Sequence, residues 1–317
     1  MQEPLKPVDK VEIITLEDNY IDLVSMDNSD VVRRAIPLRG AEFSNSILAE
    51  HGFSCLVRVT NKEETRTMLF DFGLSRDVAA RNAEALSVDL SQVEAAALSH
   101  GHMDHFGGMA LVAEKITQKN IALVVHPGVF KKSRCLEPFP GFKITMPVLK
   151  REAAQKAGFA VTLAEMPYPM LSGHVVFLGG IPRSTPFETG MPNAFYEAED
   201  GNVLPDPIED DSAIVMNLSG KGLIVISGCA HSGIINTVEH AKNVTGETRV
   251  HAVMGGFHLG GPSFESIIEP TVQAMKQIAP NYIVPTHCTG RKAVMTFERE
   301  FPKEFILNMA GTTLTFQ

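Results

Sequence analysis

Three features that would narrow the class of this protein are missing from its sequence. The four cysteines are scattered, and they form neither a C-x-x-C pair nor the dense pattern of a disulfide scaffold. No apolar run approaches the roughly 20 residues that a membrane-spanning helix needs. The first residues also lack the charged-then-apolar pattern of a secretory signal, so we expect a reducing, cytoplasmic location.

An excess of positive charge is missing as well. The chain has 28 Lys and Arg against 37 Asp and Glu, which gives a net charge of −9. This balance argues against nucleic acid or an anionic membrane as a general partner. With 317 residues, 44% of them hydrophobic, and no internal repeat, the chain can build a sizeable core. We therefore predict a single domain over 1–317, and the sequence does not indicate an oligomeric state.

The stretch SHGHMDHFGG, residues 99–108, is the most informative part of the chain. It places His100, His102, Asp104 and His105 within six positions, between an apolar stretch typical of a buried strand and a segment with helical spacing. Imidazole and carboxylate ligands together suit zinc, iron or manganese better than calcium or magnesium. His100 and His102 alternate on an extended backbone, whereas Asp104 and His105 follow the turn and can face a second metal. We predict one or two divalent ions, with zinc expected and iron or manganese as alternatives.

Three later stretches also end an apolar strand in Gly, His or Cys. They are LIVISGCAHSG, AVMGGFHLGG and YIVPTHCTG, and they supply His231, His258 and His287. Loops at strand ends are where rigid scaffolds place their chemistry. We interpret His231 and His287 as further metal ligands, and His258 as either a ligand or a substrate contact.

Strands followed by helices in both halves of the chain predict two sheets packed face to face with helices outside, an α/β sandwich. Early strands are expected at 11–16, 20–24, 54–60 and 66–73, and a helix capped by Ser75 follows them. Residues 181–211 contain many chain-breaking residues and read as a lid-like insert. The acids of the insert should repel long polyanions, and they are Glu197, Glu199, Asp200, Asp206, Glu209, Asp210 and Asp211.

These motifs together resemble the metallo-β-lactamase superfamily. SHGHMDHFGG, LIVISGCAHSGIINT, GGFHL, PTHCTG and IPRSTPFE resemble one branch in particular, the dihydropterin–ribofuranosylaminobenzene phosphate synthases of methanopterin-type coenzyme assembly and their bacterial relatives. The resemblance runs from about residue 47 to the end of the chain. It implies the four-layer αββα sandwich of that superfamily, with His100, His102, Asp104, His105 and His287 matching metal ligands directly.

The middle ligand is less clear from the resemblance. Many superfamily members place a metal-bridging aspartate after a strand and Gly, where this chain has Cys229, and His231 follows two residues later. We expect His231 to be the middle ligand and Cys229 to line the site. A Cys229 thiolate remains an alternative ligand, since thiolates bind zinc well. His174 in SGHVVFLGG is a further alternative.

Other residues are candidates for binding substrate. Arg183, at the start of the insert, could hold a phosphate or carboxylate through two parallel hydrogen bonds. His51 in LAEHGFS stands beside a flexible glycine and is expected to face the site. The helix that begins near Ser232 offers backbone N–H groups suited to an anion.

The resemblance implies a metal-dependent hydrolase or transferase acting on a small phosphorylated or anionic substrate. In the transfer reaction of the branch, a diphosphate leaves from a pterin methylene. Asp104 would bind metal and also accept a proton. Two alternatives stay open: an iron-dependent redox enzyme using the same ligands, and a non-catalytic ligand sensor on the same fold.

Overall fold

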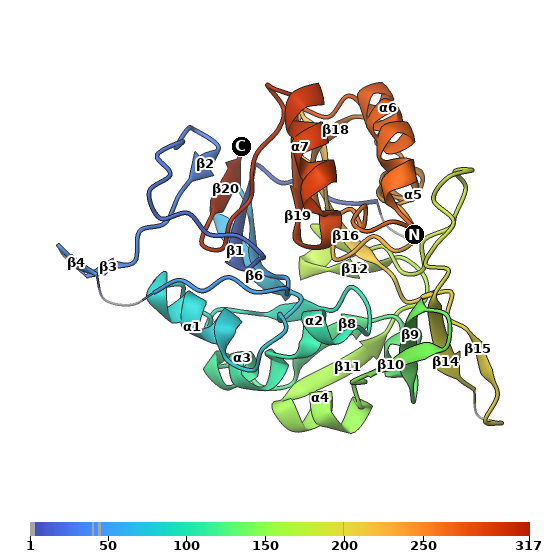
Figure 1. Cartoon of the computed structure of the whole chain (residues 1–317). Helices are drawn as coiled ribbons and strands as arrows, with labels where there is room; N and C mark the ends of the chain where they lie inside the picture. The colour runs from blue at the N-terminus through green and yellow to red at the C-terminus, as the bar shows by residue number, and fades with distance from the viewer. Residues whose placement is uncertain (1–3, 40, 44–45, 199) are drawn as a thin grey trace.

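Two mixed β-sheets lie face to face in the structure, a computed structural model that describes residues 4–39, 41–43, 46–198 and 200–317 (Figure 1). Glu199, one of the acids of the predicted insert, lies outside the described residues. Helices cover the outer face of each sheet, so the chain folds into the four layers that were predicted.

The first sheet has eight strands in the order β11-β8-β7-β6-β5-β1-β20-β2. Strands β6, β7, β8 and β11 run parallel, whereas β5, β1, β20 and β2 join through antiparallel pairs. The strand bounds are β1 Lys10–Glu17, β2 Val32–Arg33, β5 Ser54–Asn61, β6 Glu64–Phe70, β7 Ala95–Ala97, β8 Ile121–Val125, β11 Phe159–Leu163 and β20 Thr313–Phe316.

The second sheet has six strands in the order β12-β13-β16-β17-β18-β19. Strands β17, β18 and β19 are parallel and the others are antiparallel. Their bounds are β12 Tyr168–Met170, β13 Val175–Phe177, β16 Ala213–Leu218, β17 Gly222–Ser227, β18 Val250–Gly256 and β19 Tyr282–Thr286. The short strands β3 Leu38–Arg39 and β4 Glu42–Phe43 pair with each other and form a separate two-stranded sheet.

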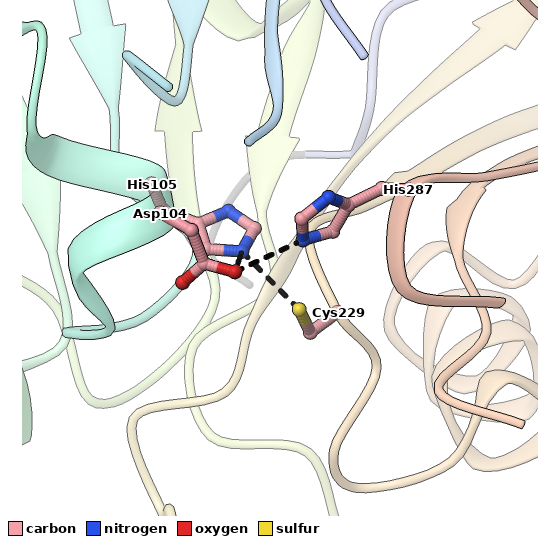
Figure 2. A group of neighbouring side chains, drawn as sticks. All are labelled: Asp104, His105, Cys229 and His287. Atoms are coloured by element: carbon pink, nitrogen blue, oxygen red, sulfur yellow. Dashed lines mark hydrogen bonds and ion pairs between the residues drawn. The ribbon is translucent and has the colours of Figure 1, made fainter. Parts of the chain in front are cut away.

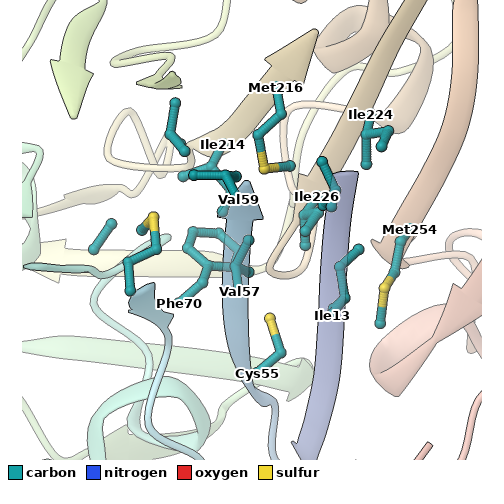
Figure 3. Packing of buried hydrophobic residues seen from close by; sticks show 14 of the residues in the cluster. Ile13, Cys55, Val57, Val59, Phe70, Ile214, Met216, Ile224, Ile226 and Met254 are labelled. Atoms are coloured by element: carbon teal, nitrogen blue, oxygen red, sulfur yellow. The ribbon is translucent and has the colours of Figure 1, made fainter. Parts of the chain in front are cut away.

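The main hydrophobic core fills the space between the two sheets. Side chains such as Ile13, Val57 and Phe70 from the first sheet meet Ile214 and Ile226 from the second, and all five are fully buried (Figure 3). Strands buried on both faces read as continuous apolar runs, and IALVV in β8 and GLIVI in β17 are two examples.

Helices complete the two outer layers, because each packs an apolar face on a sheet. One cluster joins α1, α3 and α4 to the first sheet, and another joins α5, α6 and α7 to the second. The helix bounds are α1 Val78–Ala85, α2 Met103–Phe106, α3 Met109–Lys115, α4 Arg151–Ala157, α5 Ile234–Thr245, α6 Ile268–Ile278 and α7 Arg291–Glu300. Short 3-10 turns lie at Pro127–Phe130, Leu171–Gly173, Glu265–Ile267 and His287–Thr289.

Two local predictions were wrong. The segment 20–24 is an irregular turn rather than a strand, and its Val24 is 82% exposed. Ser75 does not cap α1, because Asp77 occupies the N-cap position and the Ser75 hydroxyl donates to Glu50 instead. The strand lacks a neighbouring strand to pair with, whereas the helix forms as expected but begins two residues later than a Ser75 cap would require.

A small third sheet stands at one side of the sandwich (Figure 1). Its strand order is β10-β9-β14-β15, so a hairpin from the middle of the chain pairs with a hairpin from the predicted insert. The strand bounds are β9 Arg134–Phe139, β10 Phe142–Met146, β14 Ala194–Glu197 and β15 Val203–Pro205.

Among the described residues, no helix is long and apolar enough to span a membrane.

Candidate metal centre

The loops that follow β7, β17, β18 and β19 carry the side chains predicted to bind metal. Strands β17, β18 and β19 are parallel neighbours, so their carboxyl ends meet at one edge of the second sheet. The loop after β7 meets them from the first sheet. As a result, side chains that are far apart in the sequence, such as Asp104 and His287, lie close together.

Three imidazoles form the first group of the centre. His231 Nε2 lies 3.1 Å from His100 Nε2 and 3.1 Å from His102 Nδ1. His100 is fully buried, and His102 and His231 are nearly so. Burial and the neighbouring histidines hold the pKa of His100 and His231 well below the ordinary value, and burial lowers the pKa of His102 to about 4. The three rings are therefore neutral at pH 7, the form that binds a metal.

Asp104, His105, Cys229 and His287 form the second group, and their side chains point toward one another (Figure 2). Asp104 Oδ2 lies 3.3 Å from His287 Nε2, and His105 Nε2 lies 3.2 Å from Cys229 Sγ. Burial would raise the pKa of Asp104, but His105 and His287 outweigh it and hold that pKa well below its usual range. Asp104 is therefore an ionised carboxylate.

Cys229 belongs to both groups. Its Sγ lies within 4.8 Å of the ligand atoms of Asp104, His105 and His287, and also of those of His100 and His231. Cys229 further groups with His258 and Cys288, two residues from the loops after β18 and β19. The structure thus brings both candidates for the middle ligand, His231 and Cys229, to the same centre. None of these groups, as found among the described residues, contains His174.

The donors fit a transition metal. Nitrogen, sulfur and carboxylate ligands suit zinc or iron, whereas magnesium and calcium prefer oxygen alone. His231 Nε2 lies 3.1 Å from a ring nitrogen of His100 and 3.1 Å from one of His102, and unprotonated nitrogens cannot hydrogen-bond to each other, because each contact needs a proton between the two atoms. A cation shared by the three nitrogens resolves this conflict.

Asp71 orients His105 and was missed by the sequence reasoning. Its Oδ2 lies 2.7 Å from His105 Nδ1, and both side chains are fully buried. Burial would lower the pKa of His105, but Asp71 and then Asp104 outweigh it and raise that pKa to about 9. Asp71 follows strand β6 in LFDFG, so an acid directly after a buried strand was the available signal.

A second missed carboxylate, Asp18, holds the His287 loop. It follows β1, and it accepts hydrogen bonds from the His287 backbone N–H at 2.9 Å and from the Thr286 hydroxyl. Asn19 donates to the His287 carbonyl at 2.7 Å and lies 3.2 Å from His51 Nδ1. His51 itself stands at the mouth of the centre: its Nε2 is 3.8 Å from Asp104 Oδ2, and its side chain is 61% exposed.

Three of the seven acids of the predicted insert face the protein interior, whereas Glu197, Asp200 and Glu209 are exposed. The expectation that the insert repels polyanions therefore rests on the exposed acids and stays a prediction. Asp206, Asp210 and Asp211 are all buried. Asp210 accepts the Gly101 N–H at 2.8 Å and pairs with the buried Arg134 at 2.7 Å, so it fixes the backbone between His100 and His102. These acidic side chains can be buried because each has a buried hydrogen-bond or ion-pair partner.

The start of α5 is not open to an anion, which corrects an expectation from the sequence. Glu188 from the insert accepts the N–H groups of Ile235 at 2.9 Å and Asn236 at 2.8 Å, and Asp211 accepts the Ser232 N–H at 2.8 Å. The donors are thus used by the chain's own carboxylates. Arg183 is exposed and donates to the Pro207 carbonyl, so its described hydrogen bond lies within the insert.

Comparisons with known proteins show the family of the chain. A family model described as the metallo-β-lactamase superfamily matches residues 49–133. A relative from Methanocaldococcus jannaschii, 7,8-dihydropterin-6-methyl-4-(β-D-ribofuranosyl)-aminobenzene-5'-phosphate synthase, is 30% identical over 311 residues, which is 98% of each chain. An uncharacterised protein of the same organism is 32% identical over 246 residues, covering 78% of this chain and 86% of its own.

A solved structure gives the same result for the fold. It is described as a metal-dependent hydrolase of the β-lactamase superfamily, and it is 26% identical with a TM-score of 0.71, covering 97% of this chain and 98% of its own. The predicted αββα fold is therefore confirmed. A relative at 30% identity over nearly the whole chain also confirms the resemblance on which that prediction was based. The chain belongs to the metallo-β-lactamase superfamily, within the branch that includes the dihydropterin–ribofuranosylaminobenzene phosphate synthase.

Proposed function

We propose that this protein is a metal-dependent transferase that joins a pterin methylene carbon to an aromatic amine, with diphosphate as the leaving group. The observation that carries the proposal is the similarity to the synthase over 98% of both chains, together with a centre whose donors fit metal. Its substrates would be small and anionic. Hydrolysis of a small phosphoester is the second candidate, supported by the similarity to the metal-dependent hydrolase.

The candidate ligands fall into two sets, one for each metal ion. His100, His102 and His231 would hold one ion, and Asp104, His105 and His287 a second, with Cys229 between the two groups. Bound metal supplies positive charge that stabilises a leaving diphosphate in transfer, or lowers the pKa of water in hydrolysis.

Asp104 is the residue placed to move a proton. It is ionised, and 17% of its side chain is exposed, so a substrate can reach it. In the transfer, the amine nitrogen attacks the methylene carbon and the bond from that carbon to the diphosphate oxygen breaks. The amine then loses a proton, which the Asp104 carboxylate accepts.

The test is an assay with both substrates. Protein loaded separately with zinc, manganese or iron is incubated with the diphosphate ester of 6-hydroxymethyl-7,8-dihydropterin and with 4-(β-D-ribofuranosyl)aminobenzene 5'-phosphate. We expect diphosphate release and a joined product that require both substrates. Release of diphosphate or phosphate from one substrate alone would indicate the hydrolase, and the absence of any turnover with every metal would contradict both.

Matched histidine variants show whether the centre is responsible. His102→Ala is expected to abolish product formation. His251→Ala is the control, because His251 bonds Asn281 and packs on Tyr282, outside the metal-binding groups. Equal loss in both variants would mean that the effect comes from folding rather than from the centre.

A further inference from the structure

A cavity of about 200 Å³ adjoins the first histidine group through His231. Its floor is buried and includes Ala230, His231 and Phe257, whereas its rim includes the exposed residues Ser263 and Ser266. Because His231 belongs both to this floor and to the metal centre, a molecule in the cavity contacts a metal ligand. We call this cavity the ring pocket.

The ring pocket has an aromatic and aliphatic part and a polar part, the latter including Thr189 and Ser263. Phe187, Phe257 and Phe264 contribute aromatic side chains, and Pro192 and Ile267 add aliphatic surface. None of its described lining residues is a lysine or arginine. Glu188 also lines the pocket, but both of its oxygens accept backbone N–H groups of α5. A phosphate would therefore find no cationic partner here, whereas a flat uncharged ring would find aromatic walls.

His258 provides a free polar atom in the same pocket. Its Nδ1 is buried and has no hydrogen-bond partner among the described residues. Its ring lies between His231, with centroids 4.3 Å apart, and Phe264, with centroids 4.6 Å apart. The residue also adopts a left-handed backbone with φ of 46°, a conformation that costs free energy for a residue with a side chain. Buried unpaired atoms and strained backbones are both enriched where ligands bind.

We propose that the ring pocket binds the flat, uncharged ring of the substrate, with Phe264 against the ring and His258 hydrogen-bonding its edge. This proposal rests on the proposed function, because it takes the pterin as the ring in question. It places the two parts of one substrate: the pterin in the ring pocket, and the diphosphate at the metal centre on the far side of His231. The methylene carbon would then lie between them.

The pocket is already shaped to receive such a ring. Glu188 fastens the segment that carries Phe187 to the start of α5, and Asn236 Oδ1 accepts the backbone N–H groups of Ser184 and Thr185 at 2.9 Å each. Gly233 lies so close to Glu188 that a Cβ there would be 2.1 Å from a carboxylate oxygen. These contacts fix one wall, so little ordering of the chain opposes binding.

The experiment measures the binding of each half of the substrate separately, without turnover. The probes are 6-hydroxymethyl-7,8-dihydropterin, followed by its fluorescence, and inorganic diphosphate, followed by calorimetry, both with zinc-loaded protein. Phe264→Ala should weaken pterin binding on the order of tenfold, the size expected for one lost aromatic contact. Diphosphate binding should stay unchanged. Phe139→Ala is the matched control, because Phe139 is 67% exposed on the small outer sheet.

A second variant tests the hydrogen bond to the ring edge. His258→Asn removes the imidazole but keeps a residue type that tolerates the left-handed backbone, so the loop should hold its shape. It should weaken pterin binding and not diphosphate binding. Because binding is measured directly, a merely structural role in folding would instead reduce the binding of both probes.

The possible failures can be told apart. If the parent protein binds diphosphate but no pterin, the pterin substrate is wrong and both proposals fall. If the parent binds pterin and both variants bind it equally well, only the placement in the ring pocket is overturned. A parallel loss of diphosphate and pterin binding would also overturn the placement, because the two halves would then share one subsite.

Discussion

Asp71→Asn tests how the protein prepares His105 for metal. The Asp71 carboxylate accepts the proton of His105 Nδ1 at 2.7 Å, so Nε2, which lies 3.2 Å from Cys229 Sγ, is the ring nitrogen that can lose its proton to a metal. The other carboxylate oxygen accepts the Ser99 N–H at 2.7 Å. Asparagine keeps the shape of the side chain and one carbonyl oxygen, so the bond to Ser99 can survive.

The amide group of asparagine would then face His105 Nδ1 as a donor. This favours the tautomer with its proton on Nε2, the atom that must offer a lone pair to the metal. Changes to such partners of metal-binding histidines typically cost 10–100-fold in metal affinity, about 1.4–2.7 kcal/mol. We expect a loss of that size for the ion held by Asp104, His105 and His287, and little change for the other ion.

The assay is a zinc titration against a competing chelator, combined with metal analysis and circular dichroism to show that the variant folds. Asp89→Asn is the control, because Asp89 is an exposed carboxylate in a turn with Ser91. An Asp71→Asn protein that binds two zinc ions as tightly as the parent would refute the argument that Asp71 sets the tautomer of His105.

Three further predictions concern metal content and stability. His102→Ala should lose metal and stay folded, because the sheet core does not depend on this loop; equal metal content by elemental analysis would contradict the assignment. His231→Ala should lose at least one ion. Cys229→Ser should keep most of the metal, because each of the two ligand groups retains three other donors. The reverse result in a metal analysis would make the Cys229 thiolate the middle ligand. Burial raises the pKa of Glu17 from 4.5 to about 9, with Glu50 adding to the rise. The folded state therefore holds a proton that the unfolded state releases, so its stabilising effect is complete below pH 4.5 and is lost as the pH rises toward 9, by about 1.4 kcal/mol per pH unit. Glu17→Gln should remove this slope in chemical unfolding measured across that range, and an unchanged slope would mean that Glu17 is ionised in the folded protein.

Much of the fold could be predicted from local patterns. Continuous apolar runs indicated the strands that end at His231, His258 and His287, and the segment with helical spacing after the first motif is α3. The helix expected near Ser232 is α5. The segment 20–24 shows where this reasoning stops. It is rich in β-forming residues, but among the described residues no strand pairs with it, and a strand is stable only where another strand supplies its hydrogen bonds.

The sequence by itself determined four of the candidate ligands, because His100, His102, Asp104 and His105 lie within six positions and their chemistry is that of a metal site. It also determined that single histidines end three later strands. Only the tertiary structure decided which carboxylates support those ligands. Asp71 and His105, which contact each other, are 34 positions apart in the sequence, and Asp210 and Gly101 are 109 apart. Glu188 accepts a backbone N–H at the start of α5, where the sequence predicted an anion site. These pairs form because a buried carboxylate is stable only where a hydrogen-bond donor or a cation replaces the water it has lost. Which donor lies beside it depends on how segments that are distant in the sequence pack together.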